Sequence, residues 1–121
     1  MKTAVDRSGQ SERAFQAAVI ELARRLGWKV AHFRVAQNAR GDWRTPVAAD
    51  GAGFPDLVLA RAGCILFVEL KTDRGRLTPN QEAWRDVLEL AAFEAPAVLA
   101  VYVWRPRDWP EIEVELGARR G

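Results

Sequence analysis

The sequence predicts an α/β fold in which helices flank a small central mixed β-sheet. The first indication is an apolar pattern of helical period over residues 11–26. The second is a pair of short apolar runs joined by Ala62-Gly63, which predicts a β-hairpin. The third is a capped helix after Thr78 that leads into a β-branched and aromatic run over residues 98–104. The order helix, strand, hairpin, helix, strand is typical of helices packed on a sheet.

The first half of the chain is expected to contain one helix, one strand and one long loop. The helix should run from Ser11 to Leu26, because Gly27 is a natural stop. Trp28 to Val35 alternates in a way that predicts a strand. Polar residues from Ala36 to Gly53 predict a loop, and a loop of this length in a compact domain is usually functional or mobile.

The second half begins with the hairpin, whose strands are expected at Leu57 to Ala60 and Ile65 to Lys71. Thr78-Pro79-Asn80-Gln81 then predicts a helix start, with Thr78 as cap, Pro79 at the first position and Gln81 completing a capping box. That helix should end near Phe93. Its expected buried face consists of Trp84, Val87, Leu88 and Ala91.

Two further strands are expected toward the end of the chain. Val98 to Trp104 is rich in β-branched and aromatic residues and is the best strand candidate in the sequence. Ile112 to Leu116 alternates apolar and acidic residues and is expected to form a short last edge strand.

Composition limits the class of protein. The 121 residues, 49% of them hydrophobic, fit one globular domain over residues 11–121, after a flexible N-terminus over residues 1–10. No apolar run approaches the roughly 20 residues of a membrane span, and the N-terminus lacks the apolar core of a signal peptide. Cys64, the single cysteine, excludes an internal disulfide and a cysteine zinc cluster. These features together favour the cytoplasm.

The hairpin register predicts a pair of opposed acids. If Ala62 and Gly63 form a two-residue turn, Arg61 faces Cys64, and counting outward Asp56 faces Glu69. Two opposed carboxylates repel each other in an empty sheet. A divalent cation removes the repulsion, and an all-oxygen donor set suits Mg²⁺ or Mn²⁺.

A lysine shares the face of these acids. Lys71 is two residues past Glu69, so it points to the same side of the strand, about 6–7 Å along it. An ammonium beside a metal-bound water is suited to orienting the water or stabilising charge on a phosphate. This combination indicates hydrolysis of phosphodiester bonds.

Two residues at predicted helix starts have both a functional and a structural interpretation. Glu12 lies on the apolar stripe of the first helix, which fits a role at the metal site, but an acid in a first turn also interacts favourably with the helix dipole. Gln81 sits at the edge of the buried face of the second helix. It serves the capping box alone or also the site.

These residues resemble a known family. Glu12, Gly53-Phe54-Pro55-Asp56, Glu69-Leu70-Lys71 and Gln81, in this order, look like the VRR-NUC domain, a branch of the PD-(D/E)xK nuclease superfamily. The likeness extends from about Ser11 to about Trp104. Stand-alone domains of this size occur in phage and bacterial genomes, and a more distant resemblance runs to Holliday junction resolvases of the archaeal type.

The resemblance implies a restriction-endonuclease-like core and a Mg²⁺- or Mn²⁺-dependent nuclease. It implies metal binding by Asp56, Glu69 and the main-chain carbonyl of Leu70, with Lys71 as the catalytic lysine. Glu12 and Gln81 carry over as supporting active-site residues. Such members are expected to cut branched or flap DNA, often as homodimers, although neither the dimer nor the branched substrate follows from composition or spacing.

Basic residues predict a nucleic-acid surface. The net charge is +2 with a pI near 9.1, which by itself is equally typical of an ordinary solvated surface. The expected DNA contacts are Arg34, Arg40, Trp43, Arg44 and Arg74. Trp43 fits either packing or stacking on an unpaired base. His32 fits a structural role or a phosphate contact better than a catalytic base.

Two rival functions remain at this level. One is a DNA-binding module that retains the fold without the chemistry, although binding alone gains nothing from opposed acids. The other is a small interaction protein in which the motif arises by chance.

Overall fold

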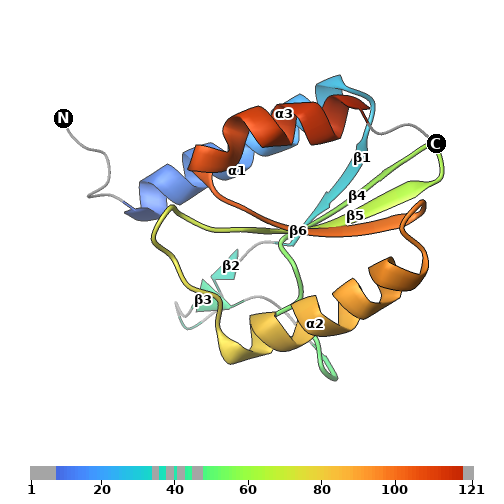
Figure 1. Ribbon diagram of the computed structural model, residues 1–121. Coiled ribbons are helices and arrows are strands. Elements are labelled where there is room, and N and C mark those ends of the chain that lie inside the picture. The colour runs from blue at the N-terminus through green and yellow to red at the C-terminus, as the bar shows by residue number, and fades with distance from the viewer. Residues whose placement is uncertain (1–7, 34–35, 38–39, 41–42, 45–47, 119–121) are drawn as a thin grey trace.

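The computed structural model describes residues 8–33, 36–37, 40, 43–44 and 48–118 (Figure 1). In this part of the chain, five strands follow the first helix, and the remaining helices come after them. The elements in order are α1 (Ser8–Arg25), β1 (Lys29–His32), β2 (Ala36–Gln37), β3 (Trp43–Arg44), β4 (Leu57–Arg61), β5 (Cys64–Leu70), α2 (Pro79–Glu94), β6 (Leu99–Trp104), the 3₁₀ helix η2 (Pro106–Asp108) and α3 (Trp109–Ala118).

The main sheet is mixed, as predicted. Its strand order is β1-β4-β5-β6, with antiparallel pairing up to β5 and a parallel β5–β6 pair. Arg61 pairs with Cys64, which confirms the two-residue turn. Ala62 and Gly63 both have positive φ (47° and 85°), the conformation that matches a tight hairpin to the twist of its strands.

Helices cover both faces of this sheet. Figure 1 shows α1 and α3 side by side on one face and α2 on the other. Burial of apolar area on the α1–α3 face dominates the stability of the fold. Five apolar residues of the hairpin are fully buried there: Leu57, Leu59, Leu66, Val68 and Leu70. The helices contribute Phe15, Val19 and Ala23 from α1 and Ile112 and Leu116 from α3.

The predicted edge strand over residues 112–116 is wrong, because this segment belongs to α3. The alternation of apolar and acidic residues also fits a helix, since Ile112 and Leu116 are four residues apart and share one face. Both are fully buried, whereas Val114 between them is exposed. The Trp28 indole donates a 3.0 Å hydrogen bond to the Leu116 carbonyl and ties the helix to the start of β1.

The buried face predicted for α2 is only partly correct. The capping box at Thr78 and Gln81 is present. Trp84 and Leu88 are half-buried, but Val87 and Ala91 are exposed, and no residue of α2 is fully buried. A single helix that lies against β6 makes only a narrow line of contact, so Val87 and Phe93 (82% exposed) fall outside it.

Several element boundaries differ from the predictions. α1 begins at Ser8, three residues earlier than expected, and β1 ends at His32 rather than Val35. The long polar loop contains a two-stranded sheet formed by β2 and β3. Within the described part of the chain, no helix has the length and apolarity to cross a bilayer. The arrangement of helices around a mixed sheet agrees with a restriction-endonuclease-like core.

Candidate metal and active site

Asp56 and Glu69 lie opposite each other at one end of the β4–β5 hairpin. The last pair of the ladder is Leu57 with Val68, and the next residues outward are these two acids. The amide N–H of Leu70 donates a 2.9 Å hydrogen bond to Oδ2 of Asp56. The carbonyl of Asp56 accepts another from the N–H of Phe33, so this residue joins β5 to the end of β1.

Pro55 explains how the ladder ends. Continued by one more residue, the register places Pro55 opposite Leu70. A proline has no N–H, so it donates no ladder hydrogen bond to the Leu70 carbonyl. The Leu70 N–H is satisfied by the Asp56 carboxylate instead. The main-chain carbonyl of Leu70 is thus not used by β4, which suits its expected role as a metal ligand.

The residues before Asp56 are anchored to α2. Gly53 has φ +86°, and a Cβ there would lie 2.5 Å from the carbonyl carbon of Asn80, so only glycine fits. Phe54 makes edge-on ring contacts with Trp84 at 5.0 Å, Phe33 at 5.6 Å and Phe67 at 6.1 Å between centroids. These contacts fix the chain that delivers Asp56.

Gln81 completes the predicted capping box and also contacts Glu69. Its backbone N–H donates to Oγ1 of Thr78 and its side-chain oxygen accepts from the Thr78 N–H, which completes the capping box. Its amide Nε2 also donates a 3.0 Å hydrogen bond to Oε2 of Glu69. The start of α2 is therefore coupled directly to the acid pair.

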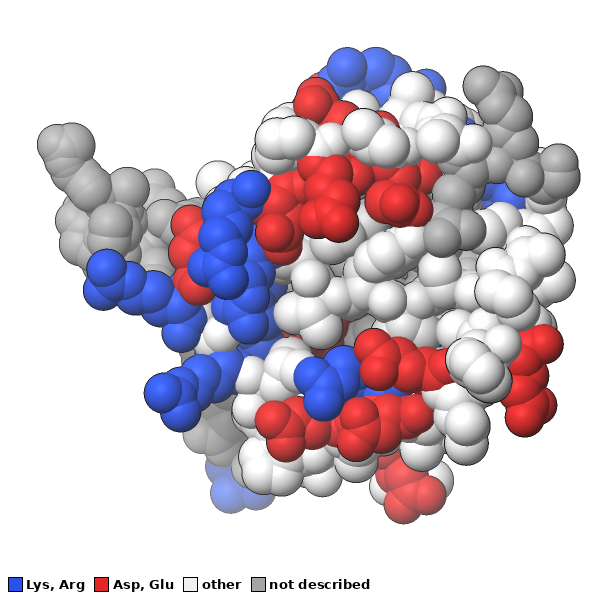
Figure 2. All heavy atoms as spheres, in the orientation of Figure 1, with Lys and Arg blue, Asp and Glu red and all other residues white. Residues whose placement is uncertain are grey.

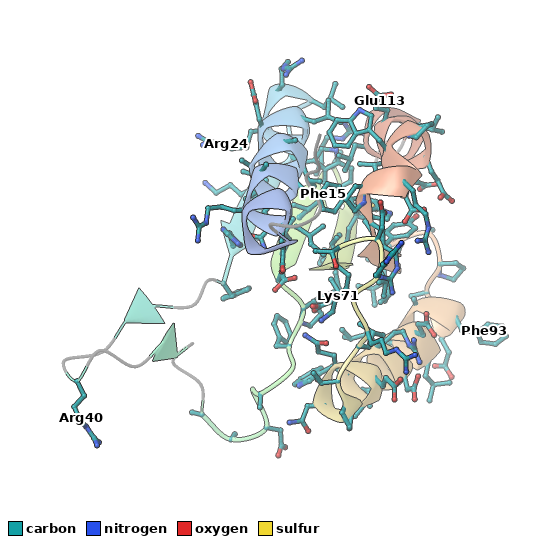
Figure 3. The ribbon with its side chains drawn as sticks, turned by 90° about the vertical axis from the view of Figure 1, so that its left-hand side faces the viewer. Phe15, Arg24, Arg40, Lys71, Phe93 and Glu113 are labelled. Atoms are coloured by element: carbon teal, nitrogen blue, oxygen red, sulfur yellow. The ribbon has the colours of Figure 1, made fainter. Side chains whose placement is uncertain are left out.

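Lys71 lies next to the same carboxylate. Its Nζ is 4.0 Å from Oε2 of Glu69, and its side chain is only 17% exposed. Figure 3 shows Lys71 in the space between α1 and α2. An ion pair in such a sheltered position is screened less by solvent than a surface pair.

Glu12 is near enough to the pair to interact with it. Burial raises the pKa of Glu12, the charge of Asp56 raises it further, and Lys71 lowers it. The acid is half-buried on α1. The helix dipole is thus not its only electrostatic partner, and α1, the residue before β4, β5 and α2 all contribute polar side chains to one end of the sheet.

Burial and mutual repulsion disturb the titration of the pair. Burial raises the pKa of Glu69 to about 8; the Asp56 charge adds to this rise and the Lys71 charge opposes it. Burial also raises the pKa of Asp56, whereas the hydrogen bond from the Leu70 N–H lowers it. Among the described residues, Glu69 is the only charged side chain that is buried, at 7% exposure. A raised pKa means that the charged form of each acid is disfavoured, and a bound cation would stabilise both carboxylates, so the pair is a favourable environment for a cation.

The donor set fits a magnesium-type ion that keeps part of its water shell. Two carboxylates and a main-chain carbonyl are hard oxygen ligands, and Mg²⁺ is typically held by one or two carboxylates with water completing the octahedron. Within the part of the chain that the structure describes, no three acidic, histidine or cysteine side chains converge on one point. The residues therefore suit an ion shared with water and a substrate phosphate better than a closed structural site.

The structure describes the side chains of only two of the five expected DNA contacts, Arg40 and Arg74. Arg34 lies outside the described residues, as do the side chains of Trp43 and Arg44. Arg40 is exposed, and Figure 3 shows it at the end of the β2–β3 segment, pointing away from the body of the protein. Arg74 is exposed three residues after Lys71.

Charge is unevenly distributed over the surface. Figure 2 shows Lys and Arg gathered on the side where, in Figure 1, the segment between β5 and α2 lies. Asp and Glu predominate over α2 and α3 in the same view. The basic side of this face is thus the one that contains the segment following Lys71.

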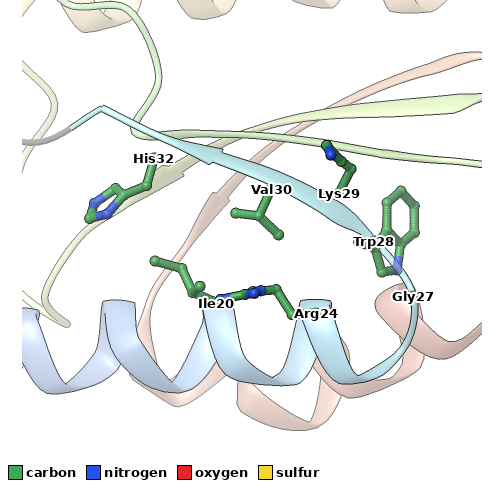
Figure 4. A pocket seen from close by; sticks show the side chains of 7 residues that line it. All are labelled: Ile20, Arg24, Gly27, Trp28, Lys29, Val30 and His32. Atoms are coloured by element: carbon green, nitrogen blue, oxygen red, sulfur yellow. The ribbon is translucent and has the colours of Figure 1, made fainter.

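An open groove of about 650 Å³ lies between α1 and the free edge of β1 (Figure 4). Three of its lining side chains are basic or titratable as bases: Arg24, Lys29 and His32. His32 lies at the end of the groove nearest the acids, because it pairs with Leu57, the residue that follows Asp56. Its charge lowers the pKa of Asp56. The sequence pattern does not predict this groove, since nothing in it shows that β1 is an edge strand facing α1.

Comparison with known proteins gives one match. A family model described as the VRR-NUC domain matches residues 34–101, more than half of the chain. The matched range contains the acid pair, Lys71 and Gln81 but not Glu12. No curated protein and no solved structure gives a match.

Proposed function

The chain belongs to the VRR-NUC domain family, which indicates a nuclease acting on DNA, and from this premise we propose that it is a Mg²⁺-dependent endonuclease. The observation that carries the proposal is the opposition of Asp56 and Glu69 beside Lys71 at the end of a hairpin. Neither a binding module nor an interaction protein has a physical need for two opposed acids, one buried and one half-buried, whose pKa values are both raised.

The divalent cation would be held by Asp56, Glu69 and the carbonyl of Leu70. When bound, it would offset negative charge on the scissile phosphate and lower the pKa of an attacking water. Gln81 keeps the Glu69 carboxylate in place through its amide. The Leu70 N–H does the same for Asp56.

Lys71 and Glu12 act on the reacting groups around these ligands. The Lys71 ammonium donates hydrogen bonds to the water or to a non-bridging phosphate oxygen, where it stabilises developing negative charge. Glu12, whose pKa is raised by burial, accepts a hydrogen bond from water in the site.

The DNA backbone is proposed to follow the basic surfaces beside the acids. One surface comprises Arg40, Trp43 and Arg44 in the β2–β3 segment together with Arg34, and a second is Arg74 after Lys71. The groove lined by Arg24, Lys29 and His32 offers a third route for phosphates. Flap or branched DNA, cut by a homodimer, is the substrate and assembly that the family resemblance favours.

A panel of DNA structures tests this proposal. Linear duplex, single strand, flap and four-way junction are incubated with Mg²⁺, with K71M as a matched control that keeps both acids. We expect cleavage of the flap or junction by the wild type and loss of at least about 100-fold in K71M. Binding without cleavage of any substrate would favour the non-catalytic module. Sedimentation in parallel tests the homodimer.

A further inference from the structure

The turn Thr72–Gly75, which follows Lys71 directly, is fastened to the segment after β6. The N–H of Lys71 donates to the Trp104 carbonyl at 3.0 Å, so the β5–β6 pairing extends to the lysine itself. Beyond it, Nη1 of Arg105 donates to the carbonyls of Thr72 at 2.7 Å and Gly75 at 2.6 Å. One guanidinium nitrogen thus bridges the first and last residues of the turn.

Further bonds hold the bridging arginine and the middle of the turn. The N–H of Arg105 donates to Oδ2 of Asp108 at 2.9 Å. Arg107 contacts Asp73 twice, through its N–H to Oδ1 at 3.0 Å and through Nη1 to the carbonyl at 2.8 Å. The turn is closed internally by a 3.2 Å bond from the Gly75 N–H to the Thr72 carbonyl. This density of hydrogen bonds makes the turn a fixed part of the site.

The turn lies against the side chain of Lys71. A Cβ built on Gly75 would be 3.5 Å from Cδ of Lys71 and 3.0 Å from Oγ1 of Thr72. A lysine loses rotamer entropy when its flexible side chain is confined, and this loss is among the largest for any side chain. Because the turn already packs beside the methylenes of Lys71, the ammonium is confined before substrate binds.

We propose that Arg105 is a positioning residue for Lys71, acting through the turn Thr72–Gly75. This inference rests on the proposed function, because it assigns Lys71 a catalytic role. Arg105 is half-buried and its Nη1 is committed to two carbonyls, so it holds the protein backbone, whereas exposed Arg74 and Arg76 on the same segment face solvent. Arginine suits this role because its guanidinium stays charged at every accessible pH and offers several donors in a fixed plane.

Three variants separate positioning from DNA binding. R105M removes the bridge and one charge, R105K keeps the charge with a shorter reach, and R76M removes a nearby charge without disturbing the hydrogen bonds of the turn described above. Single-turnover cleavage at saturating DNA and the Kd for DNA in Ca²⁺ are measured for each, with circular dichroism confirming that the variant is folded at the assay temperature.

For R105M we expect a cleavage rate about 10–100-fold lower with a Kd within about threefold of wild type, since small misplacements of a catalytic group have effects of this size. R105K should recover part of the rate, and R76M should keep the rate and weaken binding. An unchanged rate in R105M, or a loss confined to Kd, would overturn the proposal.

Limited trypsin digestion reports on the turn without relying on catalysis. Cleavage after Arg74 should be several-fold faster in R105M than in wild type or R76M, because the turn is released. Equal rates of cleavage would show that Arg105 does not hold the turn, even if the wild type proves inactive on DNA. Faster proteolysis with an unchanged DNA cleavage rate would reduce the bridge to a purely structural role and contradict the proposal.

Discussion

The amide N–H of Leu70 donates a 2.9 Å hydrogen bond to the carboxylate of Asp56. The same carboxylate is the proposed metal ligand, so Asp56 has a structural task as well as a chemical one. Leu70 is fully buried, and a buried N–H without a partner is costly. Variants of Asp56 must therefore be chosen to separate these two tasks.

D56N and D56A are expected to differ in stability while sharing a loss of activity. Asparagine retains an oxygen that accepts from the Leu70 N–H and removes the negative charge next to Glu69, so D56N in chelator should be at least as stable as wild type. D56A leaves the N–H unpaired, which costs about 1–3 kcal/mol. Denaturant unfolding in chelator measures both. Equal stability of the two variants would show that the hydrogen bond contributes little.

The metal-free protein is expected to lose stability as pH rises. The folded-state pKa of Glu69 is raised from its ordinary 4.5 to about 8, so between these values the folded state binds more protons than the unfolded state. Stability therefore falls as pH rises through this window. Melting temperatures in chelator at about pH 5.5 and pH 8 measure the effect, and E69Q should flatten it. A melting temperature that rises with pH in wild type would contradict this prediction.

Metal should reverse this trend. A cation binds the deprotonated pair, so the increase in melting temperature produced by Mg²⁺ should be larger at about pH 8 than at about pH 6. This comparison uses the same thermal scans with and without the ion. A stabilisation by Mg²⁺ that is equal at both pH values would place the ion away from Asp56 and Glu69.

The two roles of Gln81 are separable through its capping partner. T78A removes only the acceptor for the Gln81 N–H, so it should cost about 1 kcal/mol of stability and keep cleavage near the wild-type rate. Q81L removes the other bond of the cap, from the Thr78 N–H to the Gln81 side chain, and with it the amide that donates to Glu69. It should therefore lower the cleavage rate by about tenfold or more. Unfolding and single-turnover cleavage of both variants provide the test. Equal cleavage by the two variants would leave Gln81 with the cap alone.

The β2–β3 segment is predicted to contact phosphates. Replacing Arg40 and Arg44 together should flatten the dependence of log Kd on log salt by up to about two units, at roughly 0.7–0.9 for each phosphate that is no longer neutralised. The control is a second double variant, R24A with K29A, which also removes two positive charges, but from the groove beside β1. If only the groove variant changes the slope, the DNA follows α1 and β1, and the long polar segment is a connector.

The sequence was informative where a local rule determines the geometry. The turn residues Ala62-Gly63 set the hairpin register, and that register alone placed Asp56 opposite Glu69. The capping rule located the start of α2, which brought Gln81 to the acid pair.

The sequence was uninformative where both the strand period and the helix period fit the same residues, and where hydrogen bonds join distant parts of the chain. Ile112 to Leu116 satisfies both strand and helix spacing, and burial against α1 and the sheet decides for the helix. The bond from Leu70 to Asp56 and the bridge from Arg105 to the turn after Lys71 depend on tertiary placement, which composition and spacing do not contain. The opposition of two acids by itself predicts that removing Asp56 relieves repulsion, but it does not reveal the opposing loss of the Leu70 hydrogen bond.

Single-turnover cleavage of flap and four-way junction DNA with Mg²⁺, and again with excess chelator, tests the central claim most directly. We predict cleavage by the wild type with Mg²⁺ or Mn²⁺, binding without turnover in Ca²⁺, no cleavage in chelator, and none by D56N under any of these conditions. Cleavage that persists in excess chelator, or that D56N carries out at the wild-type rate, would contradict the assignment of Asp56 and Glu69 as the metal site of a nuclease.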